Sequence, residues 1–177
     1  MTSKIIDDVK RFTQAVGCTT DVFNVEQTGL YTGLVVEESG EVLGELIPKE
    51  SMLLEMMKNS ANGFKSGAGN NLIAQADRVK LAHEMCDLLW VATGGLLSMG
   101  VDIEGAMGEL ARANMSKLHK CDVCAGSGKL LHPLNCDTVP CKWCKGAGYV
   151  CKKDENGKVI KPDTFVKADM TRFVCQK

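Results

Sequence analysis

Four glutamates lie within a short segment that otherwise has the composition of a buried helix. They are Glu37, Glu38, Glu41 and Glu45, in the stretch LVVEESGEVLGEL. Residues three, four and seven apart share one face of a helix, so the last three are expected to align with Glu37 beside them. Like charges at this spacing destabilise a helix by roughly 0.2–0.5 kcal/mol per pair. Solvent, basic partners or a cation must offset that repulsion.

A second acidic pair follows in the apolar stretch LAHEMCDLLWVA, where Glu84 and Asp87 are three residues apart. Glu38 and Glu41, also three residues apart, form the first pair. If the two helices pack together, the four carboxylates of these pairs surround one point, which is how helix bundles build metal sites. Oxygen ligands of this kind suit Mg²⁺ or Mn²⁺. The simpler alternative is a pair of solvated acidic faces. Against it, the flanks are apolar and few basic residues lie near the first pair in the sequence.

The elements that must position these carboxylates are predicted from apolar spacing and from capping signals. Aromatic residues make up only 5% of the chain while Leu and Met are plentiful, which favours packed helices over a β-sandwich. The segment SANGFKSGAGNN, at 60–71, has the composition of a loop. Helices are expected at about 3–17 with Ser3 as N-cap, 28–46, 50–59, 72–99 with a weak point at Gly94 and Gly95, and 102–118 with Asp102 as N-cap.

Charge and hydropathy exclude several classes of protein. A formal net charge of -1 gives no general affinity for nucleic acid or for a membrane surface. No apolar run approaches the ~18 residues that a membrane-spanning helix needs. The first residues, MTSKIIDDVKRF, lack the apolar core of a signal peptide, so we expect a cytoplasmic protein.

Seven of the nine cysteines fall between Cys121 and Cys175. In a reducing compartment, CxxC pairs favour a metal over disulfides or free thiols. Two copies of C-x-x-C-x-G-x-G predict a closed structural Zn²⁺ site whose ligands are Cys121, Cys124, Cys141 and Cys144. The segment is also rich in lysine, so contact with nucleic acid or with a protein is possible through it. A zinc module of that kind on a helical scaffold is the non-enzymatic alternative for the whole chain.

Several motifs, in order, resemble those of one enzyme superfamily. EESGE followed by EMCD resembles the EExxE…ExxD signature of the MazG-like all-α nucleotide pyrophosphohydrolases. The stretch LLWVATGGLLSMGVDIEGAMGELARANMSKL resembles the branch that includes phosphoribosyl-ATP pyrophosphohydrolase-like proteins, and ENGKVIKPDTFVKAD resembles a later segment of it. The resemblance covers roughly 4–118 and 153–170. The cysteine segment, which interrupts a normally short connection, resembles the zinc modules of DnaJ-type cochaperones.

The resemblance implies a mainly α fold, a MazG-like antiparallel helical bundle with a small zinc-binding insert. It implies a helical core over 1–118, the zinc insert over 119–152, and a tail over 153–177 that returns to the core. Members of the family are commonly homodimers or homotetramers, so we expect an oligomer.

The activity implied is the Mg²⁺-dependent (or Mn²⁺-dependent) hydrolysis of a nucleoside or deoxynucleoside triphosphate to the monophosphate and pyrophosphate. Cleavage of phosphoribosyl-ATP is the alternative within the enzymes. Glu37 is expected to orient or deprotonate the attacking water. By resemblance, Asn114 and Lys117 contact the sugar and phosphate of the substrate. The expected Mg²⁺ ligands are Glu38, Glu41, Glu84 and Asp87.

Overall fold

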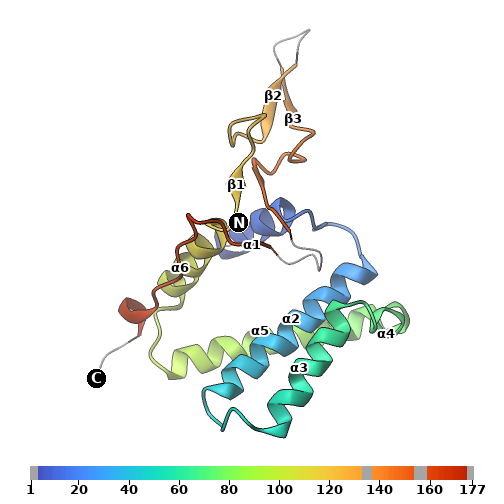
Figure 1. Cartoon of the computed structure of the whole chain (residues 1–177), viewed down its shortest axis with the longest axis vertical. Coiled ribbons are helices and arrows are strands. Elements are labelled where there is room, and N and C mark those ends of the chain that lie inside the picture. Colours follow the sequence, from blue (N-terminus) through green and yellow to red (C-terminus); the bar gives the residue numbers. More distant parts are fainter. Residues whose placement is uncertain (1–3, 133–136, 154–158, 175–177) are drawn as a thin grey trace. The chain divides into compact units, whose positions relative to one another are not determined.

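The computed structural model describes residues 4–132, 137–153 and 159–174, and the mainly α fold class predicted from the sequence is confirmed (Figure 1). The helices within these residues are α1 (Lys4–Ala15), α2 (Val25–Gly44), α3 (Met52–Lys65), α4 (Asn70–Gln75), α5 (Arg78–Ser98) and α6 (Ile103–Met115). The short strands are β1 (His119–Lys120), β2 (Lys129–Leu131), β3 (Thr138–Pro140) and β4 (Tyr149–Val150), and a 3₁₀ turn, η1, spans Thr171–Phe173. None of the described helices combines the length and the apolarity that a bilayer span requires.

Contacts divide the chain into two compact units, which we describe separately. The hairpin unit comprises residues 21–85, and the cysteine unit comprises residues 1–20 together with 86–177. Helix α5 contributes its beginning to the first unit and the rest to the second. The division into a core, an insert and a tail that the sequence suggests stays a prediction.

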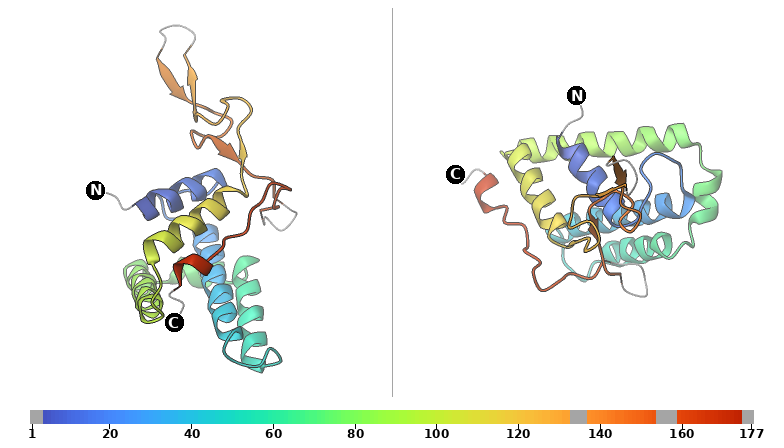
Figure 2. Two further views of the ribbon diagram at one scale, coloured as in Figure 1. Left: turned by 90° about the vertical axis from the view of Figure 1, so that its left-hand side faces the viewer. Right: turned by 90° about the horizontal axis from the view of Figure 1, so that it is seen from above.

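The hairpin unit consists mainly of α2 and α3, which lie side by side (Figures 1 and 2). The Asn24 side chain caps α2 by accepting a hydrogen bond from the Gln27 N–H at 2.8 Å. Ser51 caps α3 in the same way, through the N–H of Leu53. Both helices were expected from the sequence, and both caps use the side chains that favour such positions.

Glycines let α2 approach the backbone of α3. A Cβ atom on Gly33 would lie 2.7 Å from the Ala61 carbonyl oxygen and 2.7 Å from Cγ of Lys65. Ala61 is only 1% exposed, so there is no room to spare at this crossing. Gly40 faces Met57 about two turns further along α2, at ordinary van der Waals distance. The small residues therefore set how closely the two helices pack.

The loop predicted over 60–71 is wrong. Residues 60–65 continue α3, and α4 begins at Asn70 after a short turn at Gly67, whose φ is +86°. Burial of Ala61 against α2 outweighs the weak helix propensity of the Asn and Gly residues nearby.

The helix predicted over 72–99 is also divided. Its first residues belong to α4, and α5 begins at Arg78 because the Asp77 side chain accepts hydrogen bonds from the N–H groups of Val79 and Lys80, at 2.9 and 3.2 Å. Helix α5 then continues through Gly94 and Gly95 without interruption. An N-terminal cap therefore fixes the start of α5 in a stretch that apolar spacing alone reads as one continuous helix.

In the cysteine unit, α1 packs against α6 around a small core of Ala15, Val16 and Leu118. Gly17, with a φ of +84°, ends α1 as predicted, while its predicted cap, Ser3, lies outside the described residues. The Asp102 side chain caps α6 by accepting from the Gly105 N–H at 3.2 Å, which confirms that prediction. The cysteine segment packs against the ends of these two helices.

A buried carboxylate fastens the tail to α6. Glu109 accepts two hydrogen bonds from Arg112, at 2.6 and 2.8 Å, and a third from the Asp169 N–H at 3.1 Å. These donors, Arg112 first, lower the pKa of Glu109 from 4.5 to about 2. Arg112 also donates to the Lys167 carbonyl at 3.2 Å, so one ion pair holds two points of the tail.

The crossing at Gly33 predicts opposite effects for two similar substitutions. Gly33→Ala forces a methyl group into the Ala61 carbonyl, and we expect it to destabilise the protein by roughly 1–3 kcal/mol. Gly63→Ala is the matched control, because a Cβ there meets nothing within 4 Å and alanine favours a helix by about 0.5–1 kcal/mol. Urea unfolding followed by circular dichroism measures both. A shift of both variants in the same direction would contradict the crossing.

Candidate functional site

The α2 carboxylates predicted to do chemistry border a cavity in the hairpin unit. Its volume is about 270 Å³. The lining residues are Val36, Glu37, Gly40 and Glu41 of α2 with Leu54, Lys58, Ala61 and Asn62 of α3. Glu38, one position away, is exposed and does not line this cavity. The structure thus brings Glu37 and Glu41 to one hollow, which offers carboxylate oxygens next to an amide and an ammonium group.

Glu37 forms an ion pair with Lys65, whose Nζ lies 2.7 Å from Oε1 of the carboxylate. The side chains are only partly exposed, 24% for Lys65 and 37% for Glu37, so solvent screens the pair incompletely. The sequence had suggested that few basic groups lie near this helix, and for Glu37 that expectation is wrong. Lys65 therefore offsets part of the repulsion among the glutamates and fixes the orientation of one of them.

Residues of α3 that face α2 were missed by sequence reasoning. Lys58, Asn62 and Lys65 are spaced by four and then three residues, so they occupy one face of a helix. That signal is obscured because the composition of residues 60–71 predicts a loop. Once α3 is extended to Lys65, the spacing is enough to place a polar, basic face opposite an acidic one.

On α5, Glu84 and Asp87 share one face as the spacing predicts, and His83 lies beside them. Oxygen and nitrogen atoms of the three side chains lie within 4.8 Å of one another, and all three residues are exposed. Nδ1 of His83 is 3.9 Å from Oε1 of Glu84. These groups could hold a divalent cation on one side, but exposed acidic clusters of this kind are also common without one.

The predicted substrate contacts near the end of α6 lie together. Lys117 donates a hydrogen bond to Oδ1 of Asn114 at 2.7 Å, and both residues are half-buried. Nζ of Lys117 lies 5.9 Å from the centre of the Phe165 ring, and Nζ of Lys161 lies 4.8 Å from it. Phe165 was not singled out from the sequence, although it is one of only two aromatic residues in a polar tail, which is a usable signal. Two cations flanking an aromatic ring suit a ligand that carries phosphate.

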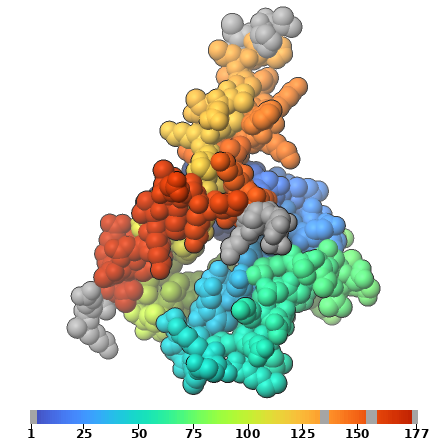
Figure 3. Space-filling view, in the orientation of Figure 1, coloured from blue at the N-terminus to red at the C-terminus, as the bar shows by residue number. Residues whose placement is uncertain are grey.

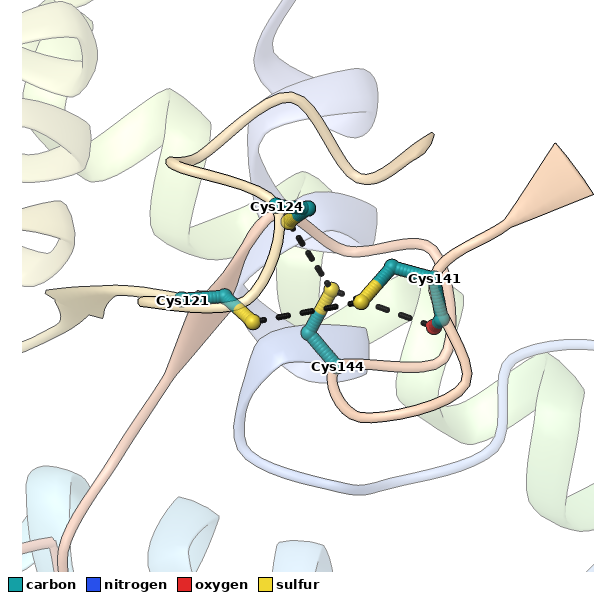
Figure 4. A group of neighbouring side chains, drawn as sticks. All are labelled: Cys121, Cys124, Cys141 and Cys144. Atoms are coloured by element: carbon teal, nitrogen blue, oxygen red, sulfur yellow. Dashed lines mark hydrogen bonds between the residues drawn. The ribbon is translucent and has the colours of Figure 1, made fainter. Parts of the chain in front are cut away.

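The cysteine segment gathers its four predicted ligands into one buried cluster (Figure 4). The Sγ atoms of Cys121 and Cys141 are 4.0 Å apart, and those of Cys124 and Cys144 are 3.7 Å apart. A tetrahedral Zn²⁺ with bonds of about 2.3 Å separates its sulfurs by roughly 3.8 Å, whereas a disulfide joins them at about 2.05 Å. The spacing suits a tetrathiolate metal site.

The two cysteine knuckles, 121–128 and 141–148, are built alike and brace each other. The Cys121 N–H donates to the Gly148 carbonyl at 2.9 Å, and the Cys141 N–H donates to the Gly128 carbonyl at 2.8 Å. A Cβ atom on either glycine would overlap a carbonyl oxygen of the other knuckle. Both ribbon and space-filling views show the two halves of the segment against one another (Figures 1 and 3). Glycine at these places is therefore required by close contact as well as by positive φ.

Burial and backbone N–H groups shift the pKa values of two of the cysteine thiols. The N–H groups of Gly128 and Gly148 point to the Sγ atoms of Cys124 and Cys144, at 3.3 and 3.2 Å. Burial raises the pKa of Cys124, but the Gly128 N–H and the neighbouring thiols outweigh it and lower that pKa to about 6. At Cys144, burial prevails and raises the pKa to about 11. A bound dication would favour the charged form of both sulfurs.

Comparison with known proteins identifies one family. A family model described as phosphoribosyl-ATP pyrophosphohydrolase matches residues 14–114, which is more than half of the chain. The matched range includes the five acidic positions and Asn114, and it ends before Lys117 and the cysteine segment. No curated protein and no solved structure matches the chain. Because the match spans both acidic motifs and most of the helical residues, the chain belongs to the phosphoribosyl-ATP pyrophosphohydrolase family.

Proposed function

We propose that this protein hydrolyses a nucleoside or deoxynucleoside triphosphate between its α and β phosphates, which releases the nucleoside monophosphate and pyrophosphate. The observation that carries the proposal is the cavity on the hairpin unit, where Glu37 and Glu41 of α2 face Lys58 and Asn62 of α3. Family membership supports a pyrophosphohydrolase activity, and α2 lies inside the matched range. The hydrophobic content of the chain, 45%, and its net charge of -1 are ordinary for a globular protein, and we propose a cytoplasmic location.

The carboxylates are proposed to hold Mg²⁺ or Mn²⁺, through Glu38, Glu41, Glu84 and Asp87. Their oxygen atoms are the ligand type that these cations prefer, and the exposure of Glu38, Glu84 and Asp87 leaves them accessible to an ion. Once bound, the cation offsets the charge of the phosphates and lowers the pKa of water. Glu45, the exposed C-cap residue of α2, is assigned no role.

Glu37 is proposed to accept the proton of the attacking water. As the water oxygen bonds to the α-phosphorus, the bond from that phosphorus to the bridging oxygen breaks, and pyrophosphate leaves. The ion pair with Lys65, at 2.7 Å, keeps the Glu37 carboxylate in one orientation, which is what a general base needs. Asn114 and Lys117 are proposed to contact the sugar and a phosphate, because an amide can donate and accept while an ammonium group binds phosphate as a point charge.

Phosphoribosyl-ATP is the second candidate substrate, and it is as well supported as the first. The description of the matching family names it, and its hydrolysis breaks the same kind of bond with the same release of pyrophosphate. The chemistry of the carboxylates does not distinguish the two substrates. A direct comparison of turnover is therefore part of the test.

Two conservative substitutions test the catalytic assignment. We expect Glu38→Gln and Asp87→Asn each to lower kcat by roughly 100-fold or more, since each removes a charge from the proposed cation site while keeping the shape of the side chain. Glu45→Gln, at the C-cap of α2, is the matched control and should leave turnover unchanged. The measurement is pyrophosphate release with Mg²⁺ from a panel of ribo- and deoxyribonucleoside triphosphates and from phosphoribosyl-ATP. No release from any of them, or equal activity in all three variants, would overturn the proposal.

We also propose that the four buried cysteines hold one structural Zn²⁺. The sulfur spacing, the two N–H···S hydrogen bonds and the burial of all four residues support a closed site. A metal also supplies the stability that so small a segment lacks, since its strands are two or three residues long. The site is structural in this proposal, so a purely non-enzymatic role for the whole chain is the less favoured alternative.

Metal analysis tests the zinc site. The purified protein should contain one zinc per chain, and Cys121→Ser should lose it because the remaining three sulfurs leave the site open. Cys86→Ser is the control, since Cys86 is exposed on α5 and away from the cluster. Replacement by Co²⁺ should give thiolate-to-metal charge-transfer absorption in the wild type and in the control. Zinc content that is unchanged by Cys121→Ser would contradict the assignment.

We further propose that the protein is a homodimer or homotetramer. Within the described chain no residue of α5 is buried, although the helix carries Leu89, Trp90 and Val91, which are 62%, 81% and 66% exposed. An apolar helix left this open to water favours association with a second copy.

Sedimentation velocity should therefore find a species larger than a monomer, and Trp90→Glu should shift it toward the monomer by placing a charge in the apolar surface. Leu131→Glu is the control, because Leu131 is 74% exposed on β2 and lies outside α5. A monomeric wild type would sink this proposal.

A further inference from the structure

A second cavity lies in the cysteine unit, where the end of α1 meets the second knuckle. Its volume is about 210 Å³. All lining residues belong to this unit, and they come from the end of α1 and from the second knuckle with the chain that follows it, among them Trp143, Lys145, Tyr149 and Lys153. Neither the proposed catalytic carboxylates nor the substrate contacts on α6 are among them. The proposed hydrolysis therefore does not account for this cavity.

Two aromatic side chains, Trp143 and Tyr149, line the cavity. Trp143 stands between the ligands Cys141 and Cys144 and is 76% exposed, an unusual position for the largest apolar side chain. The knuckle fixes its backbone, because the N–H groups of Gly146 and Ala147 are bonded back to Cys141 and Cys144 at 3.0 and 2.9 Å. Tyr149, half-buried, lines the same cavity from β4. An exposed indole on a fixed backbone is suited to stacking against a flat ring.

Positive charge surrounds these rings. Lys145 and Lys153 line the cavity, and Lys120 is the cross-strand partner of Tyr149. Over the described residues 119–132 and 137–153 the chain has six lysines and only two acidic residues. The lysines are Lys120, Lys129, Lys142, Lys145, Lys152 and Lys153, and the acidic residues are Asp122 and Asp137. Even with the net double negative charge of a zinc tetrathiolate, the segment is positive, so an anion is the favoured ligand.

We propose that this cavity binds single-stranded nucleic acid, with a base stacked on Trp143 and the neighbouring phosphates on Lys145 and Lys153. An unstacked base presents the flat face that the indole needs, whereas a duplex hides that face inside its stack. The lysines outside the cavity, more numerous than one nucleotide's phosphates require, favour a strand over a free nucleotide. This binding is additional to the hydrolysis proposed above and does not depend on it.

Fluorescence anisotropy of a labelled deoxythymidine oligonucleotide with the zinc-loaded, full-length protein tests the proposal. Trp143→Ala should weaken binding roughly 10-fold or more through lost stacking. Lys145→Ala and Lys153→Ala, made singly and together, should also weaken binding. Each should reduce the slope of log K against log salt concentration by about 0.7. Lys129→Ala, a lysine of β2 outside the cavity, is the matched control and should change binding less than either cavity lysine alone.

Further measurements keep the outcome decisive. Zinc content and pyrophosphate release should be unchanged in Trp143→Ala, which separates this proposal from the catalytic one. An abasic oligonucleotide of the same length, which keeps the phosphates and loses the rings, should bind roughly 10-fold more weakly. Equal binding of the abasic strand, equal effects of Trp143→Ala and Lys129→Ala, or competition by poly-glutamate as strong as that by oligonucleotide would each overturn the proposal. So would an absence of binding at low salt.

Discussion

Both candidate sites of this protein depend on places where two backbones meet too closely to admit a Cβ atom. In the hairpin unit, Gly33 lies against the Ala61 carbonyl and so brings α2 onto α3. In the cysteine segment, Gly128 and Gly148 each fill the space beside the other knuckle, and their carbonyls accept from Cys141 and Cys121. These glycines, which have no side chain, thereby determine where the functional side chains of both candidate sites lie. The cavity beside Glu37 and the four-sulfur cluster share this dependence.

Charge is balanced locally in the described residues by ion pairs of different strength. The Glu37–Lys65 pair is partly open to water and joins two helices. The Glu109–Arg112 pair is formed by a carboxylate that is only 7% exposed and adds a backbone N–H from the tail. The first leaves its carboxylate partly exposed, which suits a group that lines a cavity. The second is fully engaged, which suits a structural anchor. The difference in burial thus separates two glutamates that look alike in the sequence.

Much of the fold follows from the sequence because its determinants are local. Caps such as Asp102 and stops such as Gly17 act within one helical turn, so the limits they predict agree with the structure. The paired knuckles were likewise evident, because their spacing alone brings four thiols together. The prediction of a loop over 60–71 was wrong, because the packing of Ala61 against α2 outweighs the loop-like composition of this segment.

That single error concealed part of the candidate site. With α3 ending too early, Lys65 could not be assigned to a helix face, and its pairing with Glu37 was not foreseen. The pairing of Lys117 with Asn114 was easier, since both lie on one turn of α6 and its end. Contacts within an element can therefore be read from spacing, while contacts between elements require knowing how closely the elements approach.

Strands β1 and β4 pair His119 with Val150 and Lys120 with Tyr149, so the chain leaves α6 and returns to it at neighbouring points. Paired residues of antiparallel strands have Cα atoms about 4.5–5.5 Å apart. The residues between β1 and β4 form an insertion whose two ends lie side by side. Its length therefore does not alter how the chain runs from α6 to the tail. In evolutionary terms, such a cassette can be exchanged without a change in the direction of the helices that carry it, provided that its base, which includes Ala147 and Tyr149, still packs against α1 and Leu118. The same geometry makes 120–149 a natural position at which to graft a different small domain onto this enzyme family.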